Sequence, residues 1–229
     1  MSFVVKSTKG CTIKHLPILG HGNQGTVFDK GNYVTKVFSL GSSRPNDSDG
    51  KVASRISTLE LKSFVKPYNL TFNNGKLMSF DMERLFLDKE KKVVSMQIED
   101  VISSLSDIRS DVEVLSNNGI MINDFQTHNI GISNNRIRVF DFSDYSFSDT
   151  PSLPSLNNSE IDSVFGSILL MQEISDVDSI SIYDSIYSDY LRSGASTIEE
   201  YFKVNVLGHY DNLDSFVRDK VKIKSYKRS

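Results

Sequence analysis

Three polar residues stand near the middle of the chain, in the stretch Ile120–Asp144, which reads IMINDFQTHNIGISNNRIRVFDFSD. Asp124 comes first, Asn129 follows, and Asp141 lies between two phenylalanines. Two β-like runs joined by an Asn-Asn turn separate the last two, Ile130–Ile132 and Arg136–Phe140. Presented from loops and strand ends, one carboxylate could accept a proton while an amide and a second carboxylate hold a metal ion. This arrangement suits phosphoryl transfer, in which a protein mainly positions groups and neutralises charge.

A glycine-rich stretch lies far upstream. Gly20, Gly22 and Gly25, followed by Val27, form the pattern G-x-G-x-x-G-x-V. Backbone N–H groups can approach phosphate oxygens only where no side chain intervenes, so glycines suit a phosphate-binding loop. A β-turn, and not a helix, follows the pattern, which distinguishes it from a dinucleotide-binding fingerprint.

A lysine is expected inside the sheet that these glycines begin. The β-rich runs Thr26–Phe28 and Tyr33–Phe38 are separated by a good hairpin turn, and period-two alternation puts Lys36 on the same face as Val34 and Phe38. A lysine between apolar neighbours needs a negative partner. It either contacts nucleotide phosphates, which we favour, or reaches water from an edge strand.

The next predicted element is a helix over Ser54–Val65, after a Gly/Ser/Asp/Asn linker at 39–53. Glu60 falls among apolar residues on one face of that helix. An inward carboxylate needs a cation, and Lys36 is the obvious candidate. A half-exposed helix glutamate is the alternative.

Four motifs occur in the order typical of protein kinases and their relatives. Asp124 to Asn129 resembles the D-x-x-x-x-N catalytic loop, and Asp141-Phe142-Ser143 resembles the D-F-G metal-binding motif with serine for glycine. The glycine stretch resembles the loop that covers ATP, and Lys36 stands where the strand-three lysine belongs. The resemblance covers roughly residues 12–170.

The resemblance implies an α+β, two-lobed protein-kinase-like fold. An N-lobe, residues 1–85, would hold a small antiparallel sheet and one helix, and a reduced, mostly helical C-lobe would span 86–229. Apolar residues at helical spacing from Val94 to Leu115 predict the buried helix of that C-lobe. A helix opening at Ser159 would contain Asp162, which resembles the buried aspartate that begins the family's long C-lobe helix.

The same resemblance assigns roles to the residues. Asp124 would accept or orient the attacking hydroxyl, while Asn129 and Asp141 would bind Mg²⁺. Lys36 would contact the phosphates of ATP and pair with Glu60. The glycines and Val27 would cover the nucleotide. Met82-Glu83 is similar to the family's gatekeeper and hinge, so Glu83 would lie at the adenine.

Several family features are missing. Ile122-Asn123 stands in place of the His-Arg pair before the catalytic aspartate, Gln126 replaces the usual lysine, and no A-P-E motif follows Asp141. The chain therefore looks most like the minimal Ser/Thr kinases of phages and secreted bacterial effectors, with autophosphorylation plausible. Two alternatives stay open: a small-molecule phosphotransferase similar to aminoglycoside or choline kinases, and a nucleotide-binding pseudokinase that acts as an interaction module.

Composition limits the other possibilities. A net charge of −3 argues against general nucleic-acid affinity, whereas residues 139–191 carry ten Asp or Glu and no Lys or Arg, which favours a basic protein substrate. No apolar run approaches a membrane span. Cys11 is the only cysteine, so the expected compartment is the cytoplasm, or the host cytoplasm for a phage or effector protein. The sequence does not specify an oligomeric state.

Overall fold

The structure is a computed structural model that describes residues 16–22, 24–39, 47–88, 90–123, 125–168 and 179–226 of the 229-residue chain. Its class is α+β, as predicted. The chain divides into two compact units: the first comprises Met1–Leu59 and Lys66–Leu85, and the second comprises Glu60–Val65 and Phe86–Ser229. Residues 60–65 thus belong to the second unit, although the chain enters the first unit again after them. The identity of the two predicted parts, 1–85 and 86–229, as kinase lobes stays a prediction.

The first unit contains a five-stranded antiparallel sheet in the order β1-β2-β3-β5-β4. The strands are β1 (Ile18–His21), β2 (Gly25–Asp29), β3 (Tyr33–Phe38), β4 (Pro67–Asn73) and β5 (Lys76–Glu83). Asn74 and Gly75, with φ of +50° and +77°, join β4 to β5, and Gly31, with φ of +87°, lies between β2 and β3. Positive φ at such positions matches the twist of hairpin strands. The hairpin predicted from the runs Thr26–Phe28 and Tyr33–Phe38 is confirmed.

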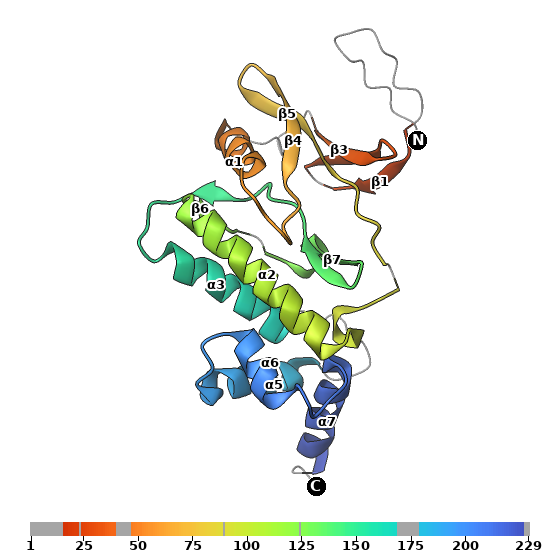
Figure 1. The fold of residues 1–229 in the computed structure, drawn as a ribbon, viewed down its shortest axis with the longest axis vertical. Coiled ribbons are helices and arrows are strands. Elements are labelled where there is room, and N and C mark those ends of the chain that lie inside the picture. The colour runs from red at the N-terminus through yellow and green to blue at the C-terminus, as the bar shows by residue number, and fades with distance from the viewer. Residues whose placement is uncertain are drawn as a thin grey trace. The chain divides into compact units, whose positions relative to one another are not determined.

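One helix, α1 (Asp47–Ser57), packs against β4 and β5 (Figure 1). Its buried apolar residues recur at helical spacing: Val52, Ala53 and Ile56. Gly50 lies so close to the sheet that an added Cβ would be 2.9 Å from the ring of Phe72. This close approach explains a glycine in the middle of a helix, where it is otherwise unfavourable.

The predicted bounds of this helix are wrong. The helix was expected over Ser54–Val65, but α1 ends at Ser57, so the later part of the predicted range is loop. The linker expected over 39–53 is helical from Asp47 onward, because burial of one helix face against the sheet outweighs the weak helix propensity of its Ser, Asp and Gly residues. Residues 40–46 lie outside the described part of the chain.

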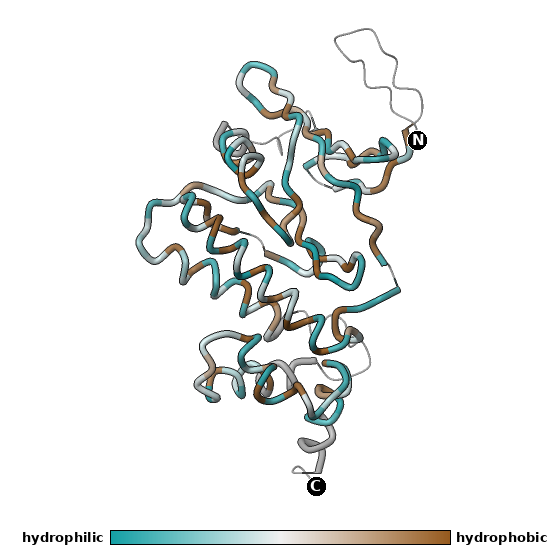
Figure 2. Tube along the Cα trace, viewed as in Figure 1, coloured by the Kyte–Doolittle hydropathy of each residue, from teal (hydrophilic) through white to brown (hydrophobic). Residues whose placement is uncertain are grey.

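The second unit is built on α2 (Ile98–Asn117), which follows the short 3₁₀ helix η1 (Val93–Ser95) and runs beside α3 (Figure 1). Its fully buried side chains repeat every three or four residues: Val101, Leu105, Ile108, Val112 and Leu115. Figure 2 shows the corresponding alternation of hydrophobic and hydrophilic residues along α2. Gly119, with φ of +70°, follows its C-cap. The buried helix predicted over Val94–Leu115 is confirmed, but it begins at Ile98, and Val94 lies in η1.

Short strands and further helices complete this unit. They are β6 (Ile120–Met121), η2 (Thr127–Asn129), β7 (Ile130–Ser133), β8 (Arg136–Val139), β9 (Ser146–Phe147), α3 (Leu153–Ser163), η3 (Val164–Ile168), α5 (Ser179–Ser193), α6 (Ile198–Asn205) and α7 (Leu213–Tyr226). β6 pairs with β9, and β7 pairs with β8. Asn134 and Asn135, with φ of +53° and +57°, form the predicted turn. Of the helices within the described residues, none is long and apolar enough to cross a membrane.

The start of α3 differs from the prediction. The helix was expected to open at Ser159, but it begins at Leu153. Pro154 lies in the first helical turn, where proline is tolerated because its missing N–H has no helical partner. Asp162 therefore lies at the end of α3 and does not begin a helix.

Candidate functional site

The hairpin of β7 and β8 brings Asn129 and Asp141 to its open end. Ile130 pairs with Val139, and one position further the Phe140 N–H donates to the Asn129 carbonyl oxygen at 2.9 Å. Asn129 thus lies opposite Phe140, the residue that precedes Asp141 in the sequence. The side chain of Asn129 is buried and that of Asp141 is half-buried. One end of the hairpin therefore carries both an amide side chain and a carboxylate side chain.

Asp141 has an unusual backbone conformation. Its φ is +66°, in the left-handed region that few residues other than glycine adopt. The carboxylate oxygen Oδ1 accepts two hydrogen bonds from Ser143, one from its hydroxyl and one from its N–H at 3.2 Å. This local Asx-type turn stabilises the conformation. Backbone outliers of this kind are concentrated at functional sites, where surrounding structure maintains them.

Asp124 lies outside the described residues, but its neighbours are fixed. The Asn123 side-chain amide donates to the Asp144 carbonyl oxygen and to the Ser146 hydroxyl, both at 2.9 Å. On the other side of Asp124, the buried ring of Phe125 packs against two further aromatic rings, those of Phe64 and Phe165. The chain around Asp124 is thus attached to the segment that follows Asp141.

A buried asparagine that the sequence analysis did not identify holds the strand before Asp124. The Asn157 side chain, on α3, is fully buried. Its Oδ1 accepts from the Ile122 N–H at 2.8 Å, and its Nδ2 donates to the Ile120 carbonyl oxygen and to the Ser116 hydroxyl, both at 2.9 Å. No local signal separates Asn157 from the adjacent Asn158, because the partners of both lie far away in sequence.

A buried carboxylate, that of Asp111 on α2, anchors the segment 60–65 beside the hairpin. It accepts hydrogen bonds at 2.7–3.0 Å from three consecutive backbone N–H groups, those of Lys62, Ser63 and Phe64. The anchored segment then joins β8, because the Val65 N–H donates to the Val139 carbonyl oxygen at 2.8 Å. Asp111 therefore supports the strand that leads to Asp141.

On its other edge the hairpin is bordered by the segment after Leu85. The Asp88 N–H donates to the Ile132 carbonyl oxygen of β7 at 2.9 Å. Gly131 has no room for a side chain, since an added Cβ would lie 2.7 Å from the Leu87 side chain. Both edges of the hairpin are thus occupied within the second unit.

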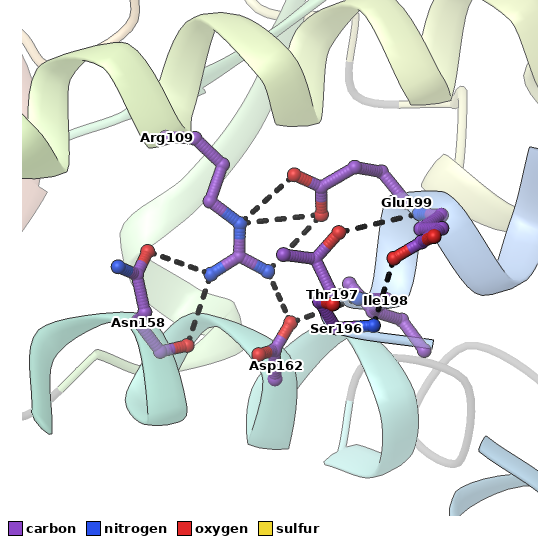
Figure 3. Close-up of polar contacts among 8 residues, drawn as sticks. Arg109, Asn158, Asp162, Ser196, Thr197, Ile198 and Glu199 are labelled. Atoms are coloured by element: carbon purple, nitrogen blue, oxygen red, sulfur yellow. Dashed lines mark hydrogen bonds and ion pairs between the residues drawn. The ribbon is translucent and has the colours of Figure 1, made fainter. Parts of the chain in front are cut away.

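Asp162 belongs to an ion-pair network between α2, α3 and α6 (Figure 3). Arg109 contacts both Asp162 and Glu199, the latter at 3.0 Å, and its Nη1 donates to Asn158. Asp162 also accepts from the Ile198 N–H at 3.0 Å. Burial raises the pKa of Asp162 although Arg109 opposes the shift, and burial together with Asp162 raises the pKa of Tyr190 to about 12. Asp162 thus joins the three helices, whereas Asn157 holds the strand before Asp124.

In the first unit, the three glycines have different surroundings. A Cβ added to Gly25 would lie 2.3 Å from the Val37 carbonyl oxygen, so the pairing of β2 with β3 requires glycine there. At Gly20 and Gly22, no heavy atom of the described residues lies within 4 Å of such a Cβ, and φ is not left-handed. The packing of the described residues therefore accounts for Gly25 and leaves Gly20 and Gly22 unexplained.

Lys36 is buried in the middle of the sheet, as its alternation with Val34 and Phe38 predicted. It is 6% exposed and lies on β3, opposite Val27 of β2 and Phe80 of β5. Its Nζ is 5.5 Å from the centre of the Phe38 ring. Burial on a central strand excludes the edge-strand alternative in which the ammonium group extends freely into water.

The two glutamates among the predicted site residues are exposed. Glu60 lies in the loop after α1, so its predicted place on the inward face of a helix is wrong. It belongs to the second unit and Lys36 to the first, and their pairing stays a prediction. Glu83 ends β5, opposite Tyr33. The following residue, Arg84, binds the Asp29 carboxylate at 2.7 Å.

The donors at the hairpin end suit a hard cation, because Mg²⁺ prefers carboxylate and amide oxygens and completes its shell with water and phosphates. Among the described residues, no group of three or more His, Cys, Asp or Glu side chains is arranged to hold a metal. Searches with protein-family models and among curated proteins found no match to this chain.

Proposed function

We propose that this chain is an ATP- and Mg²⁺-dependent phosphotransferase with a protein-kinase-like fold, and that it phosphorylates serine or threonine hydroxyls of proteins. The observation that carries the proposal is the convergence of three chain segments at the open end of the hairpin. Asn129 lies opposite Phe140, Asp141 follows in a left-handed conformation, and Asn123 attaches the loop of Asp124 to the segment after Asp141. The order and spacing of the sequence motifs give this convergence its chemical interpretation.

Each residue would have a defined task. Asp124 orients the acceptor hydroxyl and takes its proton. Asn129 and Asp141 hold Mg²⁺, which neutralises charge on the phosphates when it is bound. Lys36 supplies a cation from a buried position, where its interaction with phosphate is weakly screened by water. Backbone N–H groups near Gly20 and Gly22 approach the phosphates, and Glu83 lies near the adenine.

Transfer of a labelled phosphate tests the proposal. The chain is incubated with γ-labelled ATP and Mg²⁺, alone, with a lysine-rich basic protein, or with aminoglycosides and aminoalcohols. We expect label on protein serine or threonine. Asp124→Asn and Asp141→Asn should each reduce the rate by about 100-fold or more, since they remove a proton acceptor and a charged metal ligand. Asp149→Asn, the same change at an exposed residue, is the control and should retain the wild-type rate.

The other outcomes contradict the proposal in different ways. Label found only on small molecules would identify a small-molecule phosphotransferase. Nucleotide binding without any transfer would identify a pseudokinase. Equal rates for wild type and Asp141→Asn would remove Asp141 from the site.

A further inference from the structure

The Asn123 side chain connects two segments that lie 21 positions apart in the sequence. Its Nδ2 donates to the Asp144 carbonyl oxygen and to the Ser146 hydroxyl oxygen, both at 2.9 Å. A side-chain amide nitrogen carries two N–H groups, so both of these donors have a partner. The main chains pair close by, because Met121 of β6 lies opposite Ser146 of β9. The amide therefore extends the connection between β6 and β9 to the residue directly before Asp124.

Both acceptors of this amide are uncharged. A main-chain carbonyl and a serine hydroxyl accept hydrogen bonds without any modification of the chain. The segment that accepts them is acidic, since residues 139–168 contain five Asp or Glu and no Lys or Arg. A phosphate group added to a segment of this composition would meet like charge within it. The connection is thus complete in the unmodified chain.

We infer that Asn123 is a positioning residue that holds Asp124 in place for phosphate transfer, and that it does so without phosphorylation of the chain. The inference rests on the proposed function, because it takes Asp124 as the residue that orients the acceptor hydroxyl. Asn123 acts through the segment after Asp141 and not on the substrate. Phosphorylation of Ser146 would convert the accepting hydroxyl into a phosphate ester, so it would lower activity.

Substitutions at both ends of the contact test the role of the amide. Asn123→Ala removes both hydrogen bonds and should lower the maximal rate of transfer by about tenfold, with KM for ATP nearly unchanged. Ser146→Ala removes one of the bonds and should cause a smaller loss. The double variant should lose little more than Asn123→Ala alone, because the two residues share one contact. Ser146→Ala also decides the test if Asn123→Ala does not fold.

Asn118→Ala is the matched control. The same substitution there removes a hydrogen bond from the side-chain amide to the Val114 carbonyl oxygen, at the end of α2. This variant should keep the wild-type rate. Amide hydrogen exchange supplies a measurement that does not depend on turnover: exchange of residues 144–148 should be faster in Asn123→Ala than in wild type and unchanged in Asn118→Ala.

The dependence on phosphorylation is tested on the full chain. Treatment with a phosphatase, checked by mass spectrometry, should leave the wild-type rate unchanged, and Ser146→Glu should lower it. If the treated wild type loses its activity, or if Asn123→Ala keeps the wild-type rate or the wild-type exchange, the inference is overturned while the proposed function stands. If wild type transfers no phosphate before or after treatment, the proposed function itself fails and the positioning role fails with it.

Discussion

At the scale of single residues, glycine is required by packing at one position of the glycine pattern, and not at the other two. Gly25 is required by the close pairing of β2 with β3, but Gly20 and Gly22 have space for a methyl group. Glycine costs conformational entropy, so a glycine with no packing reason and no left-handed φ suggests that something outside the described residues approaches the backbone there. A nucleotide phosphate is the ligand that the proposed function supplies.

This difference gives a prediction about three alanine variants. Gly20→Ala and Gly22→Ala should preserve or slightly raise stability, by up to about 1 kcal/mol, because they reduce the entropy of the unfolded chain. Both should weaken ATP binding, by about tenfold if the methyl group keeps the phosphates from the backbone. Gly25→Ala should destabilise the sheet, since its Cβ would overlap the Val37 carbonyl. Thermal unfolding and nucleotide titration of each variant separate the two effects.

The outcome that contradicts this interpretation is equally specific. If Gly20→Ala and Gly22→Ala bind ATP as wild type does, the glycine pattern is only a feature of the β1–β2 turn. Gly25→Ala then remains a test of packing alone.

Single residues could be predicted only where local pattern determines their surroundings. Burial of Lys36 followed from alternation along β3, because a strand's faces are fixed by its period of two. The place of Glu60 was predicted wrongly, because its face depended on the phase of a helix that ends before it. The partners of Asn157 and Asp111 lie about 35 to 50 positions away in sequence, and no local pattern reports them.

At the scale of elements, α3 holds the strand before Asp124 through one buried side-chain amide, that of Asn157. Asn157→Ala leaves the Ile122 N–H and the Ile120 carbonyl without this partner. We expect a loss of stability of about 2 to 3 kcal/mol, the cost of buried polar groups left unsatisfied. Since Asn157 adjoins the strand before Asp124 and not the glycine loop, the maximal rate should fall by at least about tenfold while KM for ATP stays nearly unchanged.

Asn158→Ala is the matched control for this variant. It is the same substitution one position along α3, but it removes a hydrogen bond to Arg109 in the helix network. Asn158→Ala should lower stability and leave the maximal rate close to wild type at temperatures where the chain is folded. Equal losses of rate in the two variants would show that Asn157 acts only through stability.

Elements could be predicted where their signals are local. The β2–β3 and β7–β8 hairpins were predicted because Asn and Gly at their turns accept positive φ, a requirement independent of the rest of the molecule. Helix starts were missed where packing decides them. α1 begins among Ser, Asp and Gly residues that were predicted to be a linker, and α3 begins at Leu153, ahead of the predicted start at Ser159. The candidate metal ligands were predicted from motif spacing. The hydrogen bonds from Ser143 to Asp141 could not be predicted and are known only from the structure.

At the scale of the whole molecule, the second unit is discontinuous in sequence. Residues 60–65 belong to it, and they are held by Asp111 on one side and by β8 on the other. A boundary drawn at residue 85 would separate this segment from the compact unit to which it belongs.

That discontinuity has a consequence for dissecting the protein. A fragment starting at Phe86 would lack residues 60–65. The buried Asp111 carboxylate would then lose three N–H partners, and the edge of β8 would be exposed. We expect it to be less stable, by about 3 to 5 kcal/mol, than a version in which residues 60–65 are restored through a short flexible linker to Phe86. Urea unfolding of the two fragments measures the difference. Equal midpoints would mean that residues 60–65 do not contribute to the stability of the second unit. Anyone wishing to express this half of the chain by itself should carry that short peptide along.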